Sequence, residues 1–201
     1  MAFGNWITPS KLSGSGNDTV NVSANSSNTG RNARSTTLTF SAANCDNVLR
    51  TVLQAGKPET SSIQASASSE KGGGTLTISG TSNSKKLTFS KGTDNIGITL
   101  PSSYTANSVS TANGANITGD PGATAEYPFS IALTIPANTG IANKTCQLIV
   151  TDDAGNTHTC TITLAAGDAT LSVSPESVTI PWDASETKSF TVTSNTNWTI
   201  S

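Results

Sequence analysis

The sequence predicts an all-β protein of short, half-buried strands, and three observations support this prediction. Val, Ile and Thr alternate repeatedly with polar residues, which is the period of a strand that buries one face. Turns rich in Gly, Pro and Asn separate these runs. One pattern also returns after about 110 residues: it runs from Asn28 to Gly56, and again from Asn138 to Gly167.

The composition favours a structural or binding protein over an enzyme. Ser, Thr and Asn make up about 40% of the 201 residues, yet the net charge is only −2, whereas disordered chains usually carry a high net charge. A single His and 12% charged residues leave little material for acid–base catalysis. We find no nucleophile elbow, phosphate loop or metal-ligand spacing, so we expect no catalytic residue, metal or cofactor. Neither nucleic acid nor a membrane is an expected partner.

Residues 1–57 predict only part of a domain. An extended segment around Trp6 opens the chain, and we expect strands at 19–24, 36–41 and 48–54. About three strands and one extended segment are too few to close a sandwich. This region therefore needs further strands from elsewhere.

Residues 58–168 predict a complete domain. The expected strands are 63–65, 75–79, 86–89, 96–100, 127–135, 148–150 and 161–164. The small, polar stretch 102–124 predicts a long loop. About seven strands over this length are typical of a complete immunoglobulin-like sandwich.

Residues 169–201 predict the front of another domain. A first strand is expected at 171–175 and continues at 178–182, and a second alternating run occupies 188–193. The segment then passes through Ser194-Asn195 to Trp198. This is again too little to bury a core by itself.

The two end segments together resemble the BACON family of immunoglobulin-like domains, found in gut Bacteroidetes and in the crAss-like phages that infect them. The residues that match the front half of the family pattern are Leu171, Val173, Pro175, Phe190, Val192, Ser194, Asn195 and Trp198. Those that match its back half are Trp6, Pro9, Ser13-Gly14-Ser15-Gly16, Asn28-Thr29-Gly30 and Gln54-Ala55-Gly56. The order is reversed, since the front half lies C-terminal here. The resemblance implies carbohydrate or mucin binding.

This reversed order predicts a composite sandwich formed by residues 1–57 and 169–201. We expect its core to contain Trp6, Phe190, Val192 and Trp198, because an immunoglobulin-like sandwich packs large apolar side chains between its sheets. The halves could meet between chains, in a head-to-tail ring or polymer, or within one chain. A third alternative is that the chain is truncated or continues into further sequence.

Two polar or aromatic clusters are candidate binding sites. Trp182 could stack on a sugar ring, although core packing is the commoner role of a tryptophan in such a domain. Asp152, Asp153 and Asn156 could supply oxygens to calcium, but Asp-Asp-Ala-Gly-Asn is also an ordinary hairpin turn, and we favour the turn.

The cysteines and the single histidine have structural interpretations. Cys45 lies in a predicted turn, whereas Cys146 and Cys160 lie on the two arms of one predicted hairpin and should be adjacent. The latter two could form a cross-strand disulfide or remain small, half-buried thiols. His158 is expected to be a strand residue that faces solvent.

Two functions are compatible with these features. The first is a non-enzymatic structural protein of a bacteriophage virion, such as a capsid decoration or fibre-associated protein, that binds capsid, other virion proteins or itself through strand complementation. Residues from Met1 to Trp6 contain no secretion signal, so this hypothesis expects synthesis in the host cytoplasm and a place on the virion surface. The second is a carbohydrate- or mucin-binding module at a bacterial cell surface or outside the cell, with a glycan as its partner.

Overall fold

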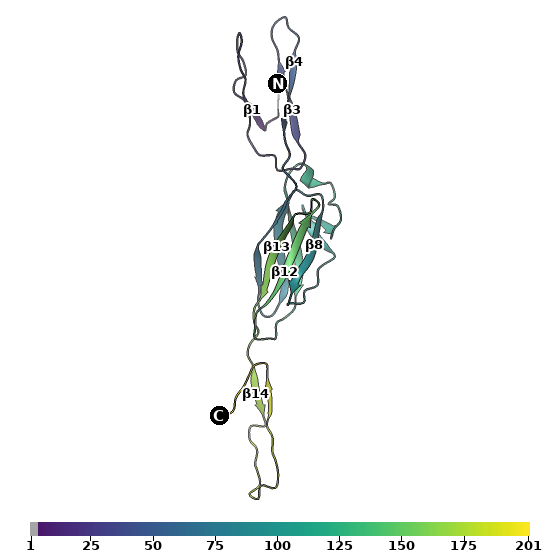
Figure 1. Ribbon diagram of the computed structural model, residues 1–201. Helices are drawn as coiled ribbons and strands as arrows, with labels where there is room; N and C mark the ends of the chain where they lie inside the picture. The colour runs from purple at the N-terminus through teal and green to yellow at the C-terminus, as the bar shows by residue number, and fades with distance from the viewer. Residues whose placement is uncertain (1–3) are drawn as a thin grey trace.

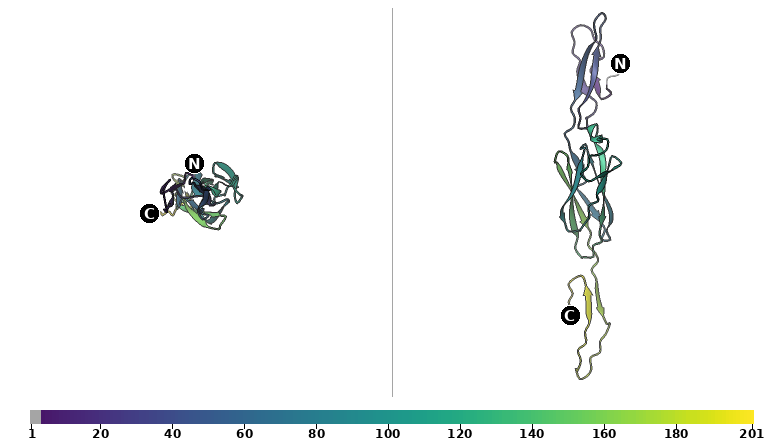
Figure 2. Two further views of the ribbon diagram at one scale, coloured as in Figure 1. Left: turned by 90° about the horizontal axis from the view of Figure 1, so that it is seen from above. Right: turned by 90° about the vertical axis from the view of Figure 1, so that its right-hand side faces the viewer.

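The computed structural model describes residues 4–201 and shows an elongated molecule with three parts in line (Figures 1 and 2). A β-sandwich lies in the middle, two hairpins project from one end, and a single long hairpin projects from the other. The prediction of an all-β, immunoglobulin-like fold is confirmed. Residues 1–3, part of the segment on which the expectation of a missing secretion signal rests, lie outside the described residues. Among residues 4–201 no helix has the length and apolar character to cross a membrane.

The central sandwich consists of two sheets. One has the strand order β10-β9-β11-β7-β5, and the other has the order β6-β13-β12-β8. Their bounds are β5 (Ser61–Ile63), β6 (Ser66–Ser69), β7 (Gly74–Ser82), β8 (Leu87–Asp94), β9 (Ser103–Ala106), β10 (Val109–Ala112), β11 (Tyr127–Ile135), β12 (Lys144–Asp152) and β13 (Thr157–Leu164). A short 3-10 turn, η1 (Pro121–Ala123), precedes β11. All pairs are antiparallel except β6 with β13, which run in parallel.

Alternating side chains of both sheets fill the sandwich core. In β11 every second residue, from Tyr127 to Ile135, is buried, as its sequence pattern predicts. Phe89 packs its ring edge-on against Tyr104 and Phe129, with centroid distances of 4.9 and 5.7 Å. Full burial of each large apolar side chain stabilises the fold by roughly 1.5–3 kcal/mol. This core closes without help from the end segments.

The structure differs from the sequence prediction in three segments of the sandwich, one of which is the unpredicted strand β6. No strand covers 96–100; Thr99 forms a single bridge to Thr134, while Ile98 is buried. The predicted loop 102–124 contains the hairpin β9–β10. Its turn places Asn107 and Ser108 at φ 47° and 65°, a left-handed conformation that usually selects glycine. Because neither position is a glycine, the usual hairpin signal is missing from this stretch.

Cys146 and Cys160 lie on adjacent strands, as predicted, but they are not directly opposite. Cys146 faces Ile162 and Cys160 faces Leu148, so the two thiols are offset by two residues along the ladder. Both are free and fully buried. Burial is the largest cause that raises the pKa of Cys146, to about 11, and it also raises the pKa of Cys160.

The segment from Asp152 to Asn156 is the hairpin turn between β12 and β13. The Asp152 carboxylate accepts hydrogen bonds from both the backbone and the side-chain N–H groups of Asn156. Asp153 instead forms ion pairs with Lys85 and Lys86. The favoured turn interpretation is therefore confirmed, and His158 is exposed on β13 as predicted.

The end segments repeat two parts of the sandwich. The N-terminal part contains β1 (Ile7–Pro9), β2 (Val22–Ala24), β3 (Arg34–Phe40) and β4 (Val48–Gln54), and the C-terminal part contains β14 (Leu171–Ser174) and β15 (Thr191–Ser194). Arg34 faces Gln54 just as Lys144 faces Leu164, 110 positions later on both strands. The β3–β4 pair therefore corresponds to β12–β13. Likewise, the β14–β15 pair corresponds to the β5–β7 pair. In each pair the first strand lies antiparallel to a strand that ends at a Ser-Asn turn, Ser194-Asn195 or Ser82-Asn83.

Candidate interaction surfaces at the two half-repeats

The N-terminal half-repeat contains an open groove of about 690 Å³. It lies between the loop from Pro9 to Val20 and the C-terminal end of β3. Leu38 and Phe40 line one wall; they correspond to Leu148 and Val150, which face the sandwich core. Leu38 is covered, but Phe40 is 43% exposed whereas Val150 is fully buried. We call this feature the N-terminal groove.

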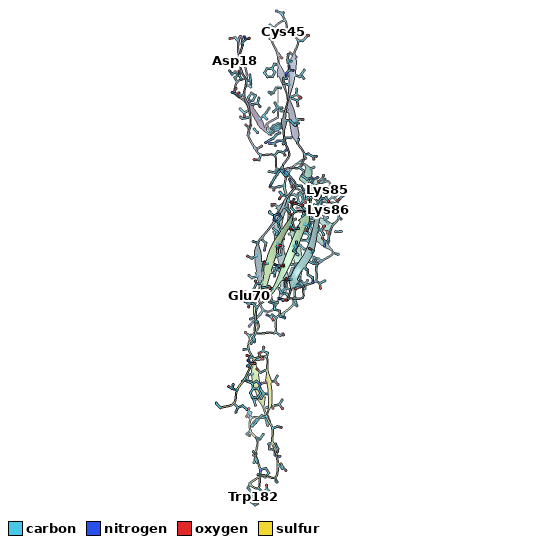
Figure 3. The ribbon with its side chains drawn as sticks, in the orientation of Figure 1. Asp18, Cys45, Glu70, Lys85, Lys86 and Trp182 are labelled. Atoms are coloured by element: carbon cyan, nitrogen blue, oxygen red, sulfur yellow. The ribbon has the colours of Figure 1, made fainter. Side chains whose placement is uncertain are left out.

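The groove exists because the two N-terminal hairpins are joined only near their base. The Gly4 backbone N–H donates to Thr36 Oγ1 at 2.9 Å, and the Arg34 guanidinium lies 4.8 Å from the Trp6 ring centroid. Farther out the hairpins separate, as the positions of Asp18 and Cys45 show in Figure 3.

An ion pair orders the loop that forms the other wall of the groove. Lys11 Nζ lies 2.7 Å from Asp18 Oδ1. The hydrogen bond from Lys11 lowers the pKa of Asp18, so the carboxylate stays charged under neutral conditions.

The C-terminal half-repeat exposes an apolar face. Its lining residues are Leu171, Val173, Phe190, Val192, Trp198, Thr199 and Ile200, around a shallow hollow of about 260 Å³. Phe190 is 49% exposed and Trp198 is 48% exposed. We call this surface the C-terminal face.

The same positions are buried in the complete sandwich. Counting from the shared Ser-Asn turn, Phe190 corresponds to Ile78, which no solvent reaches. The segment that follows the turn is one residue shorter in the C-terminal half-repeat than in the sandwich, so Trp198 corresponds to Leu87. Leu87 is likewise fully buried. The C-terminal face thus corresponds to the inner face of a sandwich sheet, and no second sheet covers it within residues 4–201. It leaves large apolar side chains in solvent, which makes it a candidate interaction surface.

One hydrogen-bonded junction attaches the N-terminal half-repeat to the sandwich. The Asn83 side-chain amide donates to the carbonyls of Thr29, Lys57 and Pro58, at 3.2–3.3 Å, and accepts from the Thr60 N–H at 2.8 Å. Asn83 is fully buried, so these bonds satisfy a polar group that would otherwise be costly to bury.

The second junction repeats this arrangement at the start of the C-terminal half-repeat. The Asn195 amide donates to the carbonyls of Thr139 and Asp168, at 3.2 and 2.8 Å, and accepts from the Thr170 N–H at 2.9 Å. Asn195 is exposed, in contrast to Asn83. Within residues 4–201 one kind of joint therefore links three successive units, of which the middle one has two large sheets.

Charged groups reinforce the first junction. Arg31 forms a bidentate ion pair with Asp120, at 2.6 and 2.8 Å, and its second guanidinium nitrogen donates to the Asn83 carbonyl. The hydrogen bond to Asp120 is the main cause that raises the pKa of Arg31. Lys57 pairs with Glu126 nearby. The Arg31 side chain is mostly covered, so this end of the sandwich holds its neighbour firmly.

The structure brings together only some of the predicted site residues. Phe190, Val192 and Trp198 share the C-terminal face, whereas Trp6 lies at the opposite end of the molecule, partly buried beside Arg34. That all four residues lie in the core of one composite sandwich stays a prediction. Trp182 is 98% exposed at the tip of the C-terminal hairpin (Figure 3).

Sequence reasoning missed the residues that shape the groove and the junctions. Nothing in the sequence indicated that Leu12, Leu38 and Phe40 line one groove, because 26 positions separate Leu12 from Leu38. The Arg31–Asp120 pair was equally hidden at a separation of 89 positions. Within residues 4–201 no group of three or more His, Cys, Asp or Glu side chains is placed to hold a metal ion.

Comparison with known proteins identifies the family of the N-terminal half-repeat. Residues 3–55 match the BACON family model, whose description is "Putative binding domain, N-terminal". This match covers about a quarter of the chain, so the likeness to a BACON domain holds for the N-terminal half-repeat. No curated protein matches it.

Among solved structures, the chain is similar to an endo-fucoidan hydrolase of glycoside hydrolase family 107, at 14% identity and a TM-score of 0.30. The match covers 83% of this chain and 22% of that enzyme's chain, so the protein spans about a fifth of its length. A TM-score this low carries no argument about function. The description of the matched family names a binding domain, and the match concerns the N-terminal half-repeat.

Proposed function

We propose that the protein is a non-enzymatic structural module of a bacteriophage virion, a capsid decoration or fibre-associated protein built from immunoglobulin-like units in series. The carrying observation is the pair of unfilled surfaces at opposite ends of a rod: the N-terminal groove, whose lining is mixed polar and apolar, and the apolar C-terminal face. Contiguous exposed apolar surface in a rod-shaped chain supports an assembly role.

The repeated junctions support a permanent structural role over a transient one. Asn83 and Asn195 fix successive units in the same way, and Arg31 adds a bidentate ion pair at the first junction. Such joints keep the units in line rather than letting them swing on a flexible linker. A spacer or fibre element needs this property.

The virion is the proposed setting because the BACON resemblance extends to crAss-like phages. The test is mass spectrometry of purified virions, combined with a capsid pull-down that uses the tagged protein. Recovery of the protein at a stoichiometry comparable to other structural proteins is expected. Its absence from washed virions, with recovery only from the lysate, would reject this function.

A second candidate function is glycan binding, which the position of Trp182 favours. This indole is almost fully exposed at a hairpin tip, where an aromatic ring could stack on a sugar. A glycan array should then give a signal that Trp182→Ala removes and Trp182→Phe partly keeps. Equal signals from the intact protein and Trp182→Ala would assign any binding elsewhere.

A further inference from the structure

We propose that the C-terminal face of one molecule fills the N-terminal groove of a second copy, so that the two half-repeats close into one composite sandwich. The inference rests on the proposed structural function and names its partner. Within one molecule the two surfaces lie at opposite ends of the central sandwich, so they do not meet there (Figures 1 and 2).

The central sandwich shows how the first composite sheet would form. There, β7 pairs with β5 on one side and with β11 on the other. The β14–β15 pair corresponds to β5–β7, and β2 corresponds to the end of β11 because each precedes an Asn-Thr-Gly loop. Segment 187–194 of one copy, which contains β15, therefore adds to segment 17–24 of the next copy, which contains β2, and this gives the sheet order β1-β2-β15-β14.

The second composite sheet would gain a strand from the last residues of the chain. In the sandwich β12 pairs with β8, and Val150 faces Phe89. The corresponding residues are Phe40 on β3 and Ile200 beyond Trp198. Segment 198–201 of one copy should therefore lie beside β3 of the next, with Ile200 opposite Phe40.

The two surfaces supply what each other lacks. The groove offers the inner side of β3 and the loop from Pro9 to Val20, while the C-terminal face offers Phe190, Val192 and Trp198. About six apolar side chains of this face would move from partial exposure to burial, which favours association. Backbone pairing adds to this gain, whereas the lost translational and rotational freedom of the two chains opposes it. Assembly should therefore depend on concentration.

Closure would also complete the second junction. At the first junction the loop before β11 covers Asn83, and Gly122 packs so closely that an added Cβ would lie 2.1 Å from the Asn83 backbone oxygen. The loop before β2 contains Ser13-Gly14-Ser15-Gly16 and holds the matching place in the next copy. It would cover Asn195, which is exposed in the single chain.

Two variants of the whole chain test this head-to-tail pairing. Phe40→Asp places a charge in the groove and leaves the C-terminal face intact, whereas Phe190→Asp does the reverse. Leu49→Asp is the matched control, since Leu49 is 60% exposed on β4 and corresponds to Thr159 on the outer side of the sandwich. All three positions lie outside the sandwich core, so the central domain of each variant should melt as it does in the intact protein.

Light scattering coupled to size-exclusion chromatography should show that the intact protein and Leu49→Asp form oligomers that grow with concentration. Each Phe variant alone should be monomeric, and their equimolar mixture should give a 1:1 heterodimer that grows no further. A monomeric intact protein at millimolar concentration, or a mixture without heterodimer, overturns the proposal. The virion measurement is independent, so the proposed function can stand if self-pairing fails.

Discussion

Asn83 and Asn195 make equivalent hydrogen bonds at the two junctions, apart from an additional bond from Asn83 to the Lys57 carbonyl, yet Asn83 is fully buried and Asn195 is exposed. The difference arises from the neighbours rather than from the asparagines. Asn83 lies under the loop before β11 and beneath Arg31, whereas the unit that contains Asn195 has no corresponding loop within the described residues 4–201. The same local motif should therefore contribute more to the free energy of unfolding at Asn83 than at Asn195.

Asn83→Ala should destabilise the protein more than Asn195→Ala. Loss of the buried Asn83 amide leaves the Thr60 N–H and several carbonyls without partners, at a cost of about 2–3 kcal/mol. At Asn195 water replaces the lost partners, and the cost should stay below about 1 kcal/mol. Urea unfolding at a concentration where the protein is monomeric measures both values. Equal losses would contradict the burial argument.

Only one of the three cysteines should react rapidly in the folded protein. Cys45 is exposed, whereas Cys146 and Cys160 are buried, and burial raises the pKa of Cys146 to about 11. Few thiolates then exist at neutral pH. A maleimide reagent should label one site in native protein, none in Cys45→Ser, and three in denatured wild type. Rapid native labelling of Cys45→Ser would show that the hairpin opens.

Asp94 should make the central sandwich sensitive to acid. Burial alone would raise the pKa of this carboxyl, but hydrogen bonds from Lys91 and from the Gly97 N–H outweigh it and lower the pKa to about 2. A lowered pKa contributes stability above the usual value of 3.8, and this contribution is lost as the pH falls toward 2.

The size of this effect is roughly 2 kcal/mol, because the Asp94 side chain is only 12% exposed. Asp94→Asn should therefore be less stable than wild type at pH 6, and the two free energies of unfolding should converge near pH 2. Denaturant unfolding between pH 2 and 6 provides the comparison. Parallel pH profiles would show that Asp94 does not contribute.

The composite register predicts an intermolecular disulfide. Thr151 faces Thr88 in the sandwich, so Ser41 of one copy should face Thr199 of another. Directly opposed strand residues lie about 4.5–5.5 Å apart at Cα, within the range that a disulfide requires. Ser41→Cys with Thr199→Cys, in a Cys45→Ser background, should give a ladder of covalent oligomers under mild oxidation. The matched pair Ser41→Cys with Ser185→Cys, at the hairpin tip, should not.

Removal of residues 169–201 should abolish assembly but leave the central sandwich folded. Its core from Ile78 to Leu164 contains no side chain from either end segment. Residues 58–168 expressed alone should therefore also melt cooperatively. If the deletion leaves the oligomeric state unchanged, the composite sandwich is wrong; a broad melt of 58–168 would mean that the domain needs its neighbours.

Much of the fold could be predicted because strand alternation is a local signal. The limits of β11 follow directly from its alternating residues, and β4 covers the predicted run 48–54. Strand β6, with the sequence Ser-Ala-Ser-Ser, escaped prediction because small polar residues show no hydrophobic period. The β9–β10 turn escaped because Asn107 and Ser108 adopt left-handed conformations without a glycine.

The candidate surfaces were only partly predictable. Sequence motifs identified Phe190 and Trp198 as core positions of an incomplete unit, since their family places them in a core. They could not indicate that Phe40 and the loop around Leu12 form an open groove, because this depends on where two hairpins separate in space. Contacts between distant residues, such as Arg31 with Asp120, leave no periodic trace in a single sequence.

The parallel pairing of β6 with β13 has a consequence for mechanical tension. The chain enters the sandwich near β6 at one end of the rod and leaves from β13 at the other. A pull along the rod therefore drags these strands in opposite directions along their own length, which loads the hydrogen bonds between them in shear. The register from Ser66–Thr161 to Ser69–Leu164 must then rupture together rather than one bond at a time. A unit connected in this way resists stretching far better than a hairpin peeled from its end.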